Sequence, residues 1–215
     1  MGGLHVRGAK GVRRVGLLGG SFNPAHDGHR HVSLLALKRL GLDAVWWLVS
    51  PQNPLKPESG MAPLADRLAR ARAVARHPRI RPTDIETRLG TRYTVDTVRA
   101  LRRRWPHIRF VWLIGADNLL QLPRWHRWDM LFRLVPIAVF ARHPYSLRAL
   151  SGSAARRFAT SRLPERVVRT LAGREPPAWA FLHIRVHPAS ATAIREARGK
   201  AARRPASEKK RLANK

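Results

Sequence analysis

The sequence predicts an α/β fold: a Rossmann-like doubly wound parallel sheet with a small C-terminal helical extension. Short apolar runs alternate with helical patterns along the chain, as expected for strands joined by crossover helices. Several of these runs are continuously apolar, which is typical of parallel strands covered on both faces. The chain has 215 residues, of which 44% are hydrophobic, so it can bury a substantial core.

The first elements flank a glycine-rich loop. Val15–Gly19 is apolar and predicts a buried strand. Asp27–Leu40 has its leucines spaced for a helix, and Gly41 is a suitable stop. Ala44–Val49 is a continuous apolar run and predicts a second strand covered on both faces. Ser50–Met61, with three prolines and a glycine, is expected to form a loop at the carboxyl end of that strand.

The middle of the chain continues the alternation. Pro63–Arg76 predicts a helix, with its proline at a first-turn position. Ile80–Glu86 predicts a third strand, interrupted by Pro82. Thr94–Arg104 predicts a helix with one apolar face, and Ile108–Gly115 is the strongest strand signal.

The last part is less regular and still ends on a strand and a helix. The expected elements are a short helix ending near 122, a loop and short helix over 125–132, a strand over 135–140, helical turns near 154–160 and 164–171, a strand over 180–184, and a helix over 191–198 opened by Ser190. We expect a single domain over 14–198, a flexible basic lead over 1–13, and a basic disordered tail over 199–215.

Composition restricts the class of function. The 42 Lys and Arg residues outnumber the 13 Asp and Glu residues, a net charge of +29 that attracts nucleotides and nucleic acids. Because the basic residues are dispersed, an ordinary solvated surface is an equal explanation. No cysteine is present, which excludes disulfides, thiolate metal sites and a cysteine nucleophile. No apolar run approaches the ~18–20 residues of a membrane helix, so we expect a cytoplasmic protein with no membrane partner.

The loop Gly19–His29 is the main functional candidate. It joins a strand to a helix, where backbone N–H groups and the helix dipole can bind phosphate. Neither the dinucleotide fingerprint nor a Walker sequence occurs in it, which disfavours a dehydrogenase and a P-loop enzyme. His26 and His29 lie three residues apart and could flank one phosphate. The alternatives are histidines that merely cap the helix, and a zinc site that includes His31.

Two stretches together resemble a known family. Residues 19–29 read G-G-S-F-N-P-A-H-D-G-H, and residues 190–195 read S-A-T-A-I-R, which match the two signatures of the H-x-G-H nucleotidyltransferase superfamily. Within it, the chain most resembles the bacterial nicotinate-nucleotide adenylyltransferases, through Tyr93-Thr94, Gly115–Asn118 and Leu122–His126. The resemblance runs from about Val15 to Arg198.

The resemblance implies a reaction in NAD biosynthesis. ATP and nicotinate mononucleotide give nicotinate adenine dinucleotide and pyrophosphate, by direct in-line attack on the ATP α-phosphate. No protein nucleophile is needed, so catalysis depends on positioning and charge stabilisation. Mg²⁺ is expected on the triphosphate, held largely by phosphates and water rather than by protein ligands.

The resemblance also assigns roles to residues, each beside a simpler structural alternative. Lys56 could be a solvated loop lysine, Thr94 and Asp117 could be helix caps, and Trp125 could be an ordinary core aromatic. The expected catalytic residues are His26, His29 and Arg195; the expected ATP-binding residues are Gly19, Gly20, Ser21, Phe22, Gly28, Lys56, Gly115, Asp117, Ser190 and Thr192; the expected acceptor-binding residues are Asn23, Thr94 and Trp125.

Two alternative functions stay open at this point. A related adenylyl- or cytidylyltransferase, such as one acting on phosphopantetheine, would share both signatures. A basic nucleic-acid-binding protein would bind DNA or RNA with steep salt dependence. In the enzyme interpretation, nucleic acid is bound only non-specifically, through the basic tails. The sequence leaves the oligomeric state open.

Overall fold

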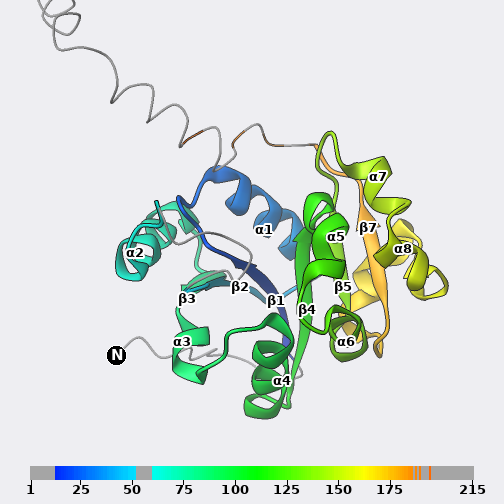
Figure 1. Ribbon diagram of the computed structural model, residues 1–215, viewed down its shortest axis with the longest axis horizontal. Helices are drawn as coiled ribbons and strands as arrows, with labels where there is room; N and C mark the ends of the chain where they lie inside the picture. The colour runs from blue at the N-terminus through cyan, green and yellow to red at the C-terminus, as the bar shows by residue number, and fades with distance from the viewer. Residues whose placement is uncertain (1–12, 52–59, 186, 188, 190–193, 195–215) are drawn as a thin grey trace, which may run out of the picture.

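The protein forms one parallel sheet with helices on both faces. The structure, a computed structural model, describes residues 13–51, 60–185, 187, 189 and 194. Within this part of the chain, seven strands form a sheet in the order β3-β2-β1-β4-β5-β7-β6, with every neighbouring pair parallel (Figure 1). The strands are β1 Arg13–Gly20, β2 Ala44–Val49, β3 Ile80–Thr83, β4 Ile108–Gly115, β5 Ile137–Phe140, β6 Arg162–Leu163 and β7 Trp179–Leu182. The predicted fold class is confirmed.

Helices form the crossover connections between the parallel strands. The α-helices are α1 Asp27–Arg39, α2 Leu64–Ala75, α3 Ile85–Leu89, α4 Thr94–Arg104, α5 Ala116–Gln121, α6 Trp128–Leu134, α7 Ser146–Leu150 and α8 Ser153–Arg157. The described residues also form three 3₁₀ segments, η1 Leu122–Arg124, η2 Ala159–Ser161 and η3 Glu165–Gly173. No helix in the described part of the chain is long and apolar enough to cross a membrane.

Each face of the sheet carries its own hydrophobic cluster. One cluster joins the sheet to α1, α2 and η3, and the other joins it to α3–α6 with α7 and α8. Trp46 and Trp47 are adjacent and fully buried, yet they lie in different clusters. Successive strand side chains point to opposite faces, so a continuous apolar run serves both cores.

The strand and helix predictions are largely confirmed. Strand 44–49, helix 94–104 and strand 108–115 have the bounds expected from sequence. The strand predicted over 80–86 is wrong beyond Thr83, because Ile85 already begins α3. Pro82 lies in β3, which is tolerated because β3 is an edge strand with neighbour β2 on one side only. Helix α7 and the two-residue strand β6 were not predicted.

The topology places the switch point between β1 and β4. These strands are neighbours, and the chain proceeds from β1 to β2 on one side and from β4 to β5 on the other. Ligands of such sheets bind outside the carboxyl ends of the strands at this point. The predicted lead and tail lie outside the described residues except for Arg13, which begins β1; the predicted helix 191–198 is described only at Ile194.

Candidate active site

The two histidines of the glycine-rich loop form a reciprocal cap at the start of α1. The ring Nδ1 of His26 accepts a hydrogen bond from the Gly28 N–H at 3.2 Å, and Nδ1 of His29 accepts one from the His26 N–H at 3.2 Å. The two ring centroids are 3.9 Å apart. Because each Nδ1 is an acceptor, the ring proton lies on Nε2 in both, which makes Nε2–H the donor each ring offers. Capping and a catalytic role are therefore compatible.

Buried groups hold His29 in place. The ring of Phe22 lies 4.7 Å from the ring of His29 and stacks on Trp47 at 5.1 Å. The indole N–H of Trp47 donates to Ser33, whose hydroxyl donates to the backbone carbonyl of His29. Phe22 is 2% exposed and has a φ of 47°, a left-handed conformation uncommon for a bulky residue. Its side chain therefore supports His29 from the core, a role the sequence did not indicate.

The environment of His26 keeps its ring neutral. Burial, the guanidinium of Arg142 and the ring of His187 lower its pKa from 6.5 to about 4, against the opposing effect of Asp27. At neutral pH, His26 therefore acts as a hydrogen-bond donor rather than as a fixed cation.

This lowered pKa predicts an acid-sensitive fold. The unfolded chain binds the His26 proton below its ordinary pKa of 6.5, whereas the folded chain binds it only near 4, so stability falls as pH drops between these values. Between pH 7 and pH 5, we expect the free energy of unfolding of the wild type to fall by about 1 kcal/mol more than that of His26→Asn, allowing for solvent screening. Urea unfolding at both pH values measures this difference. Asparagine keeps the capping oxygen. Parallel pH profiles for the two proteins would contradict the assignment.

The two adjacent glycines of the loop, Gly19 and Gly20, differ in how much room the protein leaves for a side chain. A Cβ on Gly19 would lie 2.8 Å from the ring of Trp112, which is buried, so this position excludes any side chain. A Cβ on Gly20 would meet only Phe22, with its ring at 3.6 Å and its backbone N at 4.0 Å, which is ordinary van der Waals contact. No contact in the described protein demands glycine at position 20, and its predicted contact with a nucleotide stays a prediction.

The pair gives a matched test. We expect Gly19→Ala to cost about 1–3 kcal/mol in free energy of unfolding through overpacking against Trp112. Gly20→Ala should leave stability within about 0.5 kcal/mol and raise the KM for ATP about tenfold, a loss of roughly 1.4 kcal/mol of binding. Denaturant unfolding and steady-state kinetics on both variants check this. Wild-type KM in a folded Gly20→Ala protein would remove Gly20 from the nucleotide site.

A buried arginine, missed by sequence analysis, joins the loops of this edge. Arg67 of α2 is 2% exposed, and its guanidinium donates to the backbone carbonyls of four residues. The acceptors are Ser21 at 2.7 Å, Ser50 at 2.7 Å, Pro51 at 2.9 Å and Ala62 at 2.8 Å. Burial lowers its pKa below the ordinary value. Arg67 thus ties the loop after β1 to the loop after β2; only the pattern of a lone arginine on an apolar helix face hinted at it.

Asn23 joins the same two loops from the other side. Its side-chain amide donates to the carbonyl of Gly60 at 2.9 Å and accepts from the N–H of Ala62 at 3.4 Å. The amide therefore has a structural role in this state, and its contact with an acceptor substrate stays a prediction.

An ion pair lies at the carboxyl ends of β4 and β5. Arg142 follows β5, and its guanidinium contacts Asp117 Oδ2 at 3.0 Å. Asp117 Oδ1 is buried and has no hydrogen-bond partner in the described part of the protein. A Cβ on Gly115 would lie 2.5 Å from this oxygen. The helix-cap alternative for Asp117 is wrong, because Gly115 is the N-cap of α5. Arg142 is a site residue that sequence analysis missed, since nothing marks it among the many arginines.

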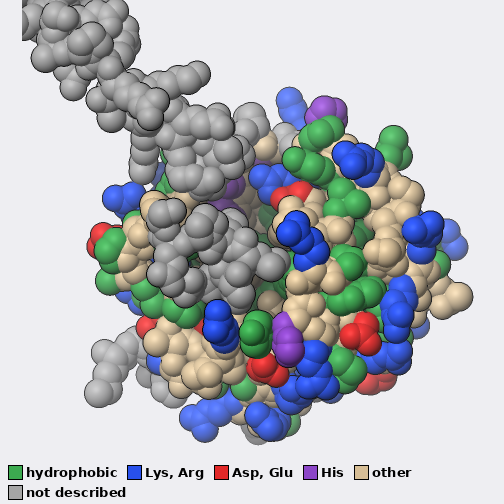
Figure 2. All heavy atoms as spheres, viewed as in Figure 1, with side chains coloured by type: hydrophobic (Ala, Val, Ile, Leu, Met, Phe, Trp, Pro, Cys, Tyr) green, Lys and Arg blue, Asp and Glu red, His purple; other side chains and the backbone are tan. Residues whose placement is uncertain are grey.

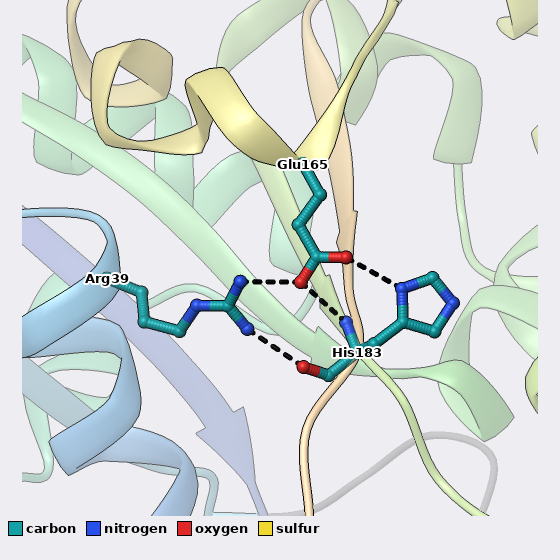
Figure 3. A network of polar contacts seen from close by, with 3 residues as sticks. All are labelled: Arg39, Glu165 and His183. Atoms are coloured by element: carbon teal, nitrogen blue, oxygen red, sulfur yellow. Dashed lines mark hydrogen bonds and ion pairs between the residues drawn. The ribbon is translucent and has the colours of Figure 1, made fainter.

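The chain after β7 is held along α1. Figure 3 shows the network that anchors it: Arg39 of α1 contacts Glu165 at 2.6 Å and the carbonyl of His183 at 2.8 Å, while Glu165 also contacts the His183 ring at 2.7 Å. Burial raises the pKa of Glu165, but hydrogen bonds from His183 and Arg39 outweigh it and lower the pKa overall.

The same segment reaches the paired histidines. His31 bonds the carbonyl of Arg185 at 2.9 Å, and a Cβ on Gly28 would lie 2.9 Å from the carbonyl of Ala189. Glycine at 28 is thus already required by the protein. Ala189, which directly precedes the second signature in the sequence, lies against Gly28 of the first signature at this edge. Lys56, Ser190, Thr192 and Arg195 themselves lie outside the described residues, and their roles stay predictions.

The two stretches expected to bind the acceptor also meet. The ring of Tyr93, before Thr94, stacks on the ring of His126, after Trp125, at 4.3 Å. Tyr93 is the N-cap residue of α4, so the cap alternative for Thr94 is wrong. Trp125 is partly buried and packs against the core cluster of this face. The contacts expected of Thr94 and Trp125 with a pyridine ring stay predictions. In Figure 2, purple histidine side chains lie in a recess in the upper part of this view, beside blue and red side chains.

The described residues offer few carboxylates at this edge. Among the residues that the structure describes, no three His, Asp or Glu side chains gather as a metal site. His31 bonds the backbone instead of joining His26 and His29, so the zinc alternative has no support in this region. The donor set fits a divalent ion that arrives with a triphosphate and keeps most of its phosphate and water ligands.

The fold and this edge define a nucleotide-binding α/β protein of the nucleotidyltransferase type. A family model described as cytidylyltransferase-like matches residues 17–197. Three relatives carry the name "Probable nicotinate-nucleotide adenylyltransferase". That of Cereibacter sphaeroides is 56% identical over 84% of this chain and 96% of its own, that of Parvibaculum lavamentivorans 55% over 86% and 92%, and that of Methylorubrum extorquens 54% over 85% and 98%. The chain belongs to the nicotinate-nucleotide adenylyltransferase family.

Solved structures agree in fold. Plasmodium falciparum nicotinic acid mononucleotide adenylyltransferase complexed with NaAD superposes with a TM-score of 0.64 at 14% identity, covering 86% of this chain and 83% of that one. The same enzyme complexed with APC gives a TM-score of 0.62 at 13% identity with the same coverage. At such low identity the likeness concerns the fold alone.

Proposed function

We propose that this chain joins ATP and nicotinate mononucleotide to give nicotinate adenine dinucleotide and pyrophosphate. The observation that carries the proposal is the pair of histidines whose Nδ1 atoms are fixed by backbone N–H groups at the carboxyl end of β1. Family membership over most of the chain supports this acceptor over phosphopantetheine and over a nucleic-acid-binding role.

The chemistry is a direct displacement. A phosphate oxygen of the mononucleotide attacks the α-phosphorus of ATP, the new P–O bond forms, and the bond to the β-phosphate breaks to release pyrophosphate. Negative charge accumulates on the oxygens around the α-phosphorus as this happens. Nε2–H of His29, and that of His26, would donate to those oxygens, and such preorganised donors each contribute about 3 kcal/mol in comparable sites.

Arg142 and Asp117 would make two further polar contacts with the substrates. The Arg142 guanidinium, close enough to lower the pKa of His26, would attract a substrate phosphate. Its ion pair leaves Asp117 Oδ1 buried and unsatisfied, so this oxygen would accept a hydrogen bond from a ribose hydroxyl. The small Gly115 leaves space beside it.

Mg²⁺ bound to the triphosphate would neutralise charge on the leaving pyrophosphate. The chain's own contribution is to orient the triphosphate through the Gly19–His29 loop and, as predicted from the second signature, through Ser190, Thr192 and Arg195. Lys56 would add a phosphate contact from the loop after β2.

The test is an acceptor panel. Pyrophosphate release would be followed with ATP and either nicotinate mononucleotide, nicotinamide mononucleotide or phosphopantetheine, and with CTP in place of ATP. We expect the highest kcat/KM with ATP and nicotinate mononucleotide. Faster turnover of phosphopantetheine or of CTP would replace this proposal, and His29→Asn serves as the control for a contaminating activity.

A further inference from the structure

Arginines surround a hollow at the opposite edge of the sheet from the active site. Arg14 of β1 and Arg109 of β4 are paired in register at the amino ends of their strands. Arg169 and Arg174 come from η3 and the residue after it. Because all strands are parallel, this edge lies about 26 Å from the carboxyl edge, the length of an eight-residue strand.

The hollow consists of two adjoining parts that share Arg109, Gly173 and Arg174. One part has a volume of about 500 Å³ and is completed by α4, through Arg99, Arg102 and Arg103. The other has a volume of about 570 Å³ and is completed by Arg14 and Arg169. In Figure 2, blue side chains gather along the lower rim of the view, where α4 lies.

These cations have few acidic partners: Arg99 pairs with Asp96 at 3.0 Å, and the Asp43 carboxylate accepts a hydrogen bond from the Arg14 backbone N–H at 2.8 Å. Glu175 is the only acidic residue that lines either part of the hollow in the described chain. The guanidinium groups of Arg14, Arg109 and Arg169 form no ion pair with any described carboxylate, and Arg109 bonds only the carbonyl of Gly173. The side chains of Arg14 and Arg169 both lie beside Gly41. A Cβ placed on Gly41 would be 3.6 Å from Arg14 Nη1 and 3.6 Å from Arg169 Nε, so the two guanidinium groups lie close to each other.

We propose that this hollow is a second anion site that binds a linear polyphosphate chain. Planar guanidinium forks match successive phosphate groups, and two adjoining hollows around Arg109 suit an extended ligand rather than a single ion. The lining offers no surface for stacking bases: its one aromatic residue, Phe110, is 4% exposed. The chemistry therefore favours an inorganic polyphosphate over a single-stranded nucleic acid. The site is independent of adenylyl transfer.

The test separates this site from the general positive charge of the molecule. Binding of inorganic polyphosphate would be measured by calorimetry at about 0.15 M salt for the full-length wild type, for the triple variant Arg14→Ala, Arg109→Ala, Arg169→Ala, and for a control. The control, Arg70→Ala, Arg72→Ala, Arg156→Ala, removes the same charge from exposed positions on α2 and α8. Circular dichroism and adenylyl transfer, expected at wild-type level in both variants, verify the fold.

We expect the site variant to bind on the order of 30-fold more weakly, and the control less than about threefold. Equal weakening in both variants would show a diffuse charge effect and overturn the proposal. Absence of binding to the wild type would do so too. Single-stranded DNA of equal charge, used as a competitor, should displace polyphosphate poorly; displacement at equal concentration would overturn the assignment of the ligand.

Discussion

His29→Asn is expected to lower kcat by about 10²–10³-fold while the protein stays folded. The asparagine carboxamide oxygen can take over the Nδ1 position and accept the hydrogen bond from the His26 N–H, which is 3.2 Å long in the wild type. It cannot reach the Nε2 position, so the donor to the reacting phosphate is lost. Steady-state kinetics with ATP and nicotinate mononucleotide, together with denaturant unfolding, measure the two effects separately.

His29→Gln is the complementary variant. Its longer side chain places an amide N–H close to the former Nε2 position, while the amide oxygen can still accept from the His26 N–H, as glutamine does at the N3 position of a capping box. We expect kcat to recover by about tenfold relative to His29→Asn, and stability to stay within about 0.5 kcal/mol of the wild type. Wild-type kcat in a folded His29→Asn protein would show that His29 only caps α1, and the proposed stabilisation of phosphate charge would then have to come from other groups.

Arg67→Leu is expected to produce the largest loss of stability, about 3 kcal/mol or more. Leucine is apolar and shorter than arginine, and it leaves the carbonyls of Ser21, Ser50 and Pro51 without the guanidinium that joins them. The loops after β1 and β2 would then lose their common anchor, and kcat should fall about 10–100-fold because the phosphate-binding loop is no longer positioned. Urea unfolding and kinetics at a temperature where circular dichroism shows the variant folded give both quantities.

Two further variants make this result specific. Arg67→Lys keeps the charge but offers one ammonium to four carbonyls, so an intermediate effect on stability and kcat is expected. Arg70→Leu, one turn along α2 and exposed, should change the free energy of unfolding by less than about 0.5 kcal/mol. If Arg67→Leu were as stable and active as Arg70→Leu, the loops would not depend on the buried guanidinium.

Family membership and the proposed nicotinate acceptor agree with the basic surface without requiring it to bind nucleic acid. A positive field draws ATP and nicotinate mononucleotide toward the molecule at either edge of the sheet. At the carboxyl edge two cations have defined surroundings: Arg142 lies close enough to His26 to lower its pKa, and Arg67 donates to the carbonyl of Ser21 in the loop. At the amino edge, seven arginines of the described chain line the hollow. The proposed adenylyl transfer takes place at the carboxyl edge and does not involve these arginines.

The sequence by itself determined most of the strands and crossover helices, and the two signatures. Residues 44–49 and 108–115 are almost continuously apolar. A parallel strand that is buried on both faces needs apolar side chains at nearly every position, so its sequence shows such a run. His26 and His29 were identifiable because their spacing and neighbouring glycines are local features of one loop. The same local logic failed at Ile85, where an edge strand ends and a helix begins within two residues.

Only the tertiary structure decided which charged residues lie at the candidate site. Arg67, Arg142 and Asp117 lie far apart in the sequence. Arg67 is marked locally only by its place on an apolar helix face, and nothing local separates Arg142 from the rest of the 42 Lys and Arg residues. Burial and hydrogen-bond geometry distinguish them: one guanidinium among four carbonyls, another against a carboxylate and a neutral histidine. Such surroundings arise from segments brought together at the carboxyl edge of the sheet, so they depend on long-range packing that no local pattern encodes.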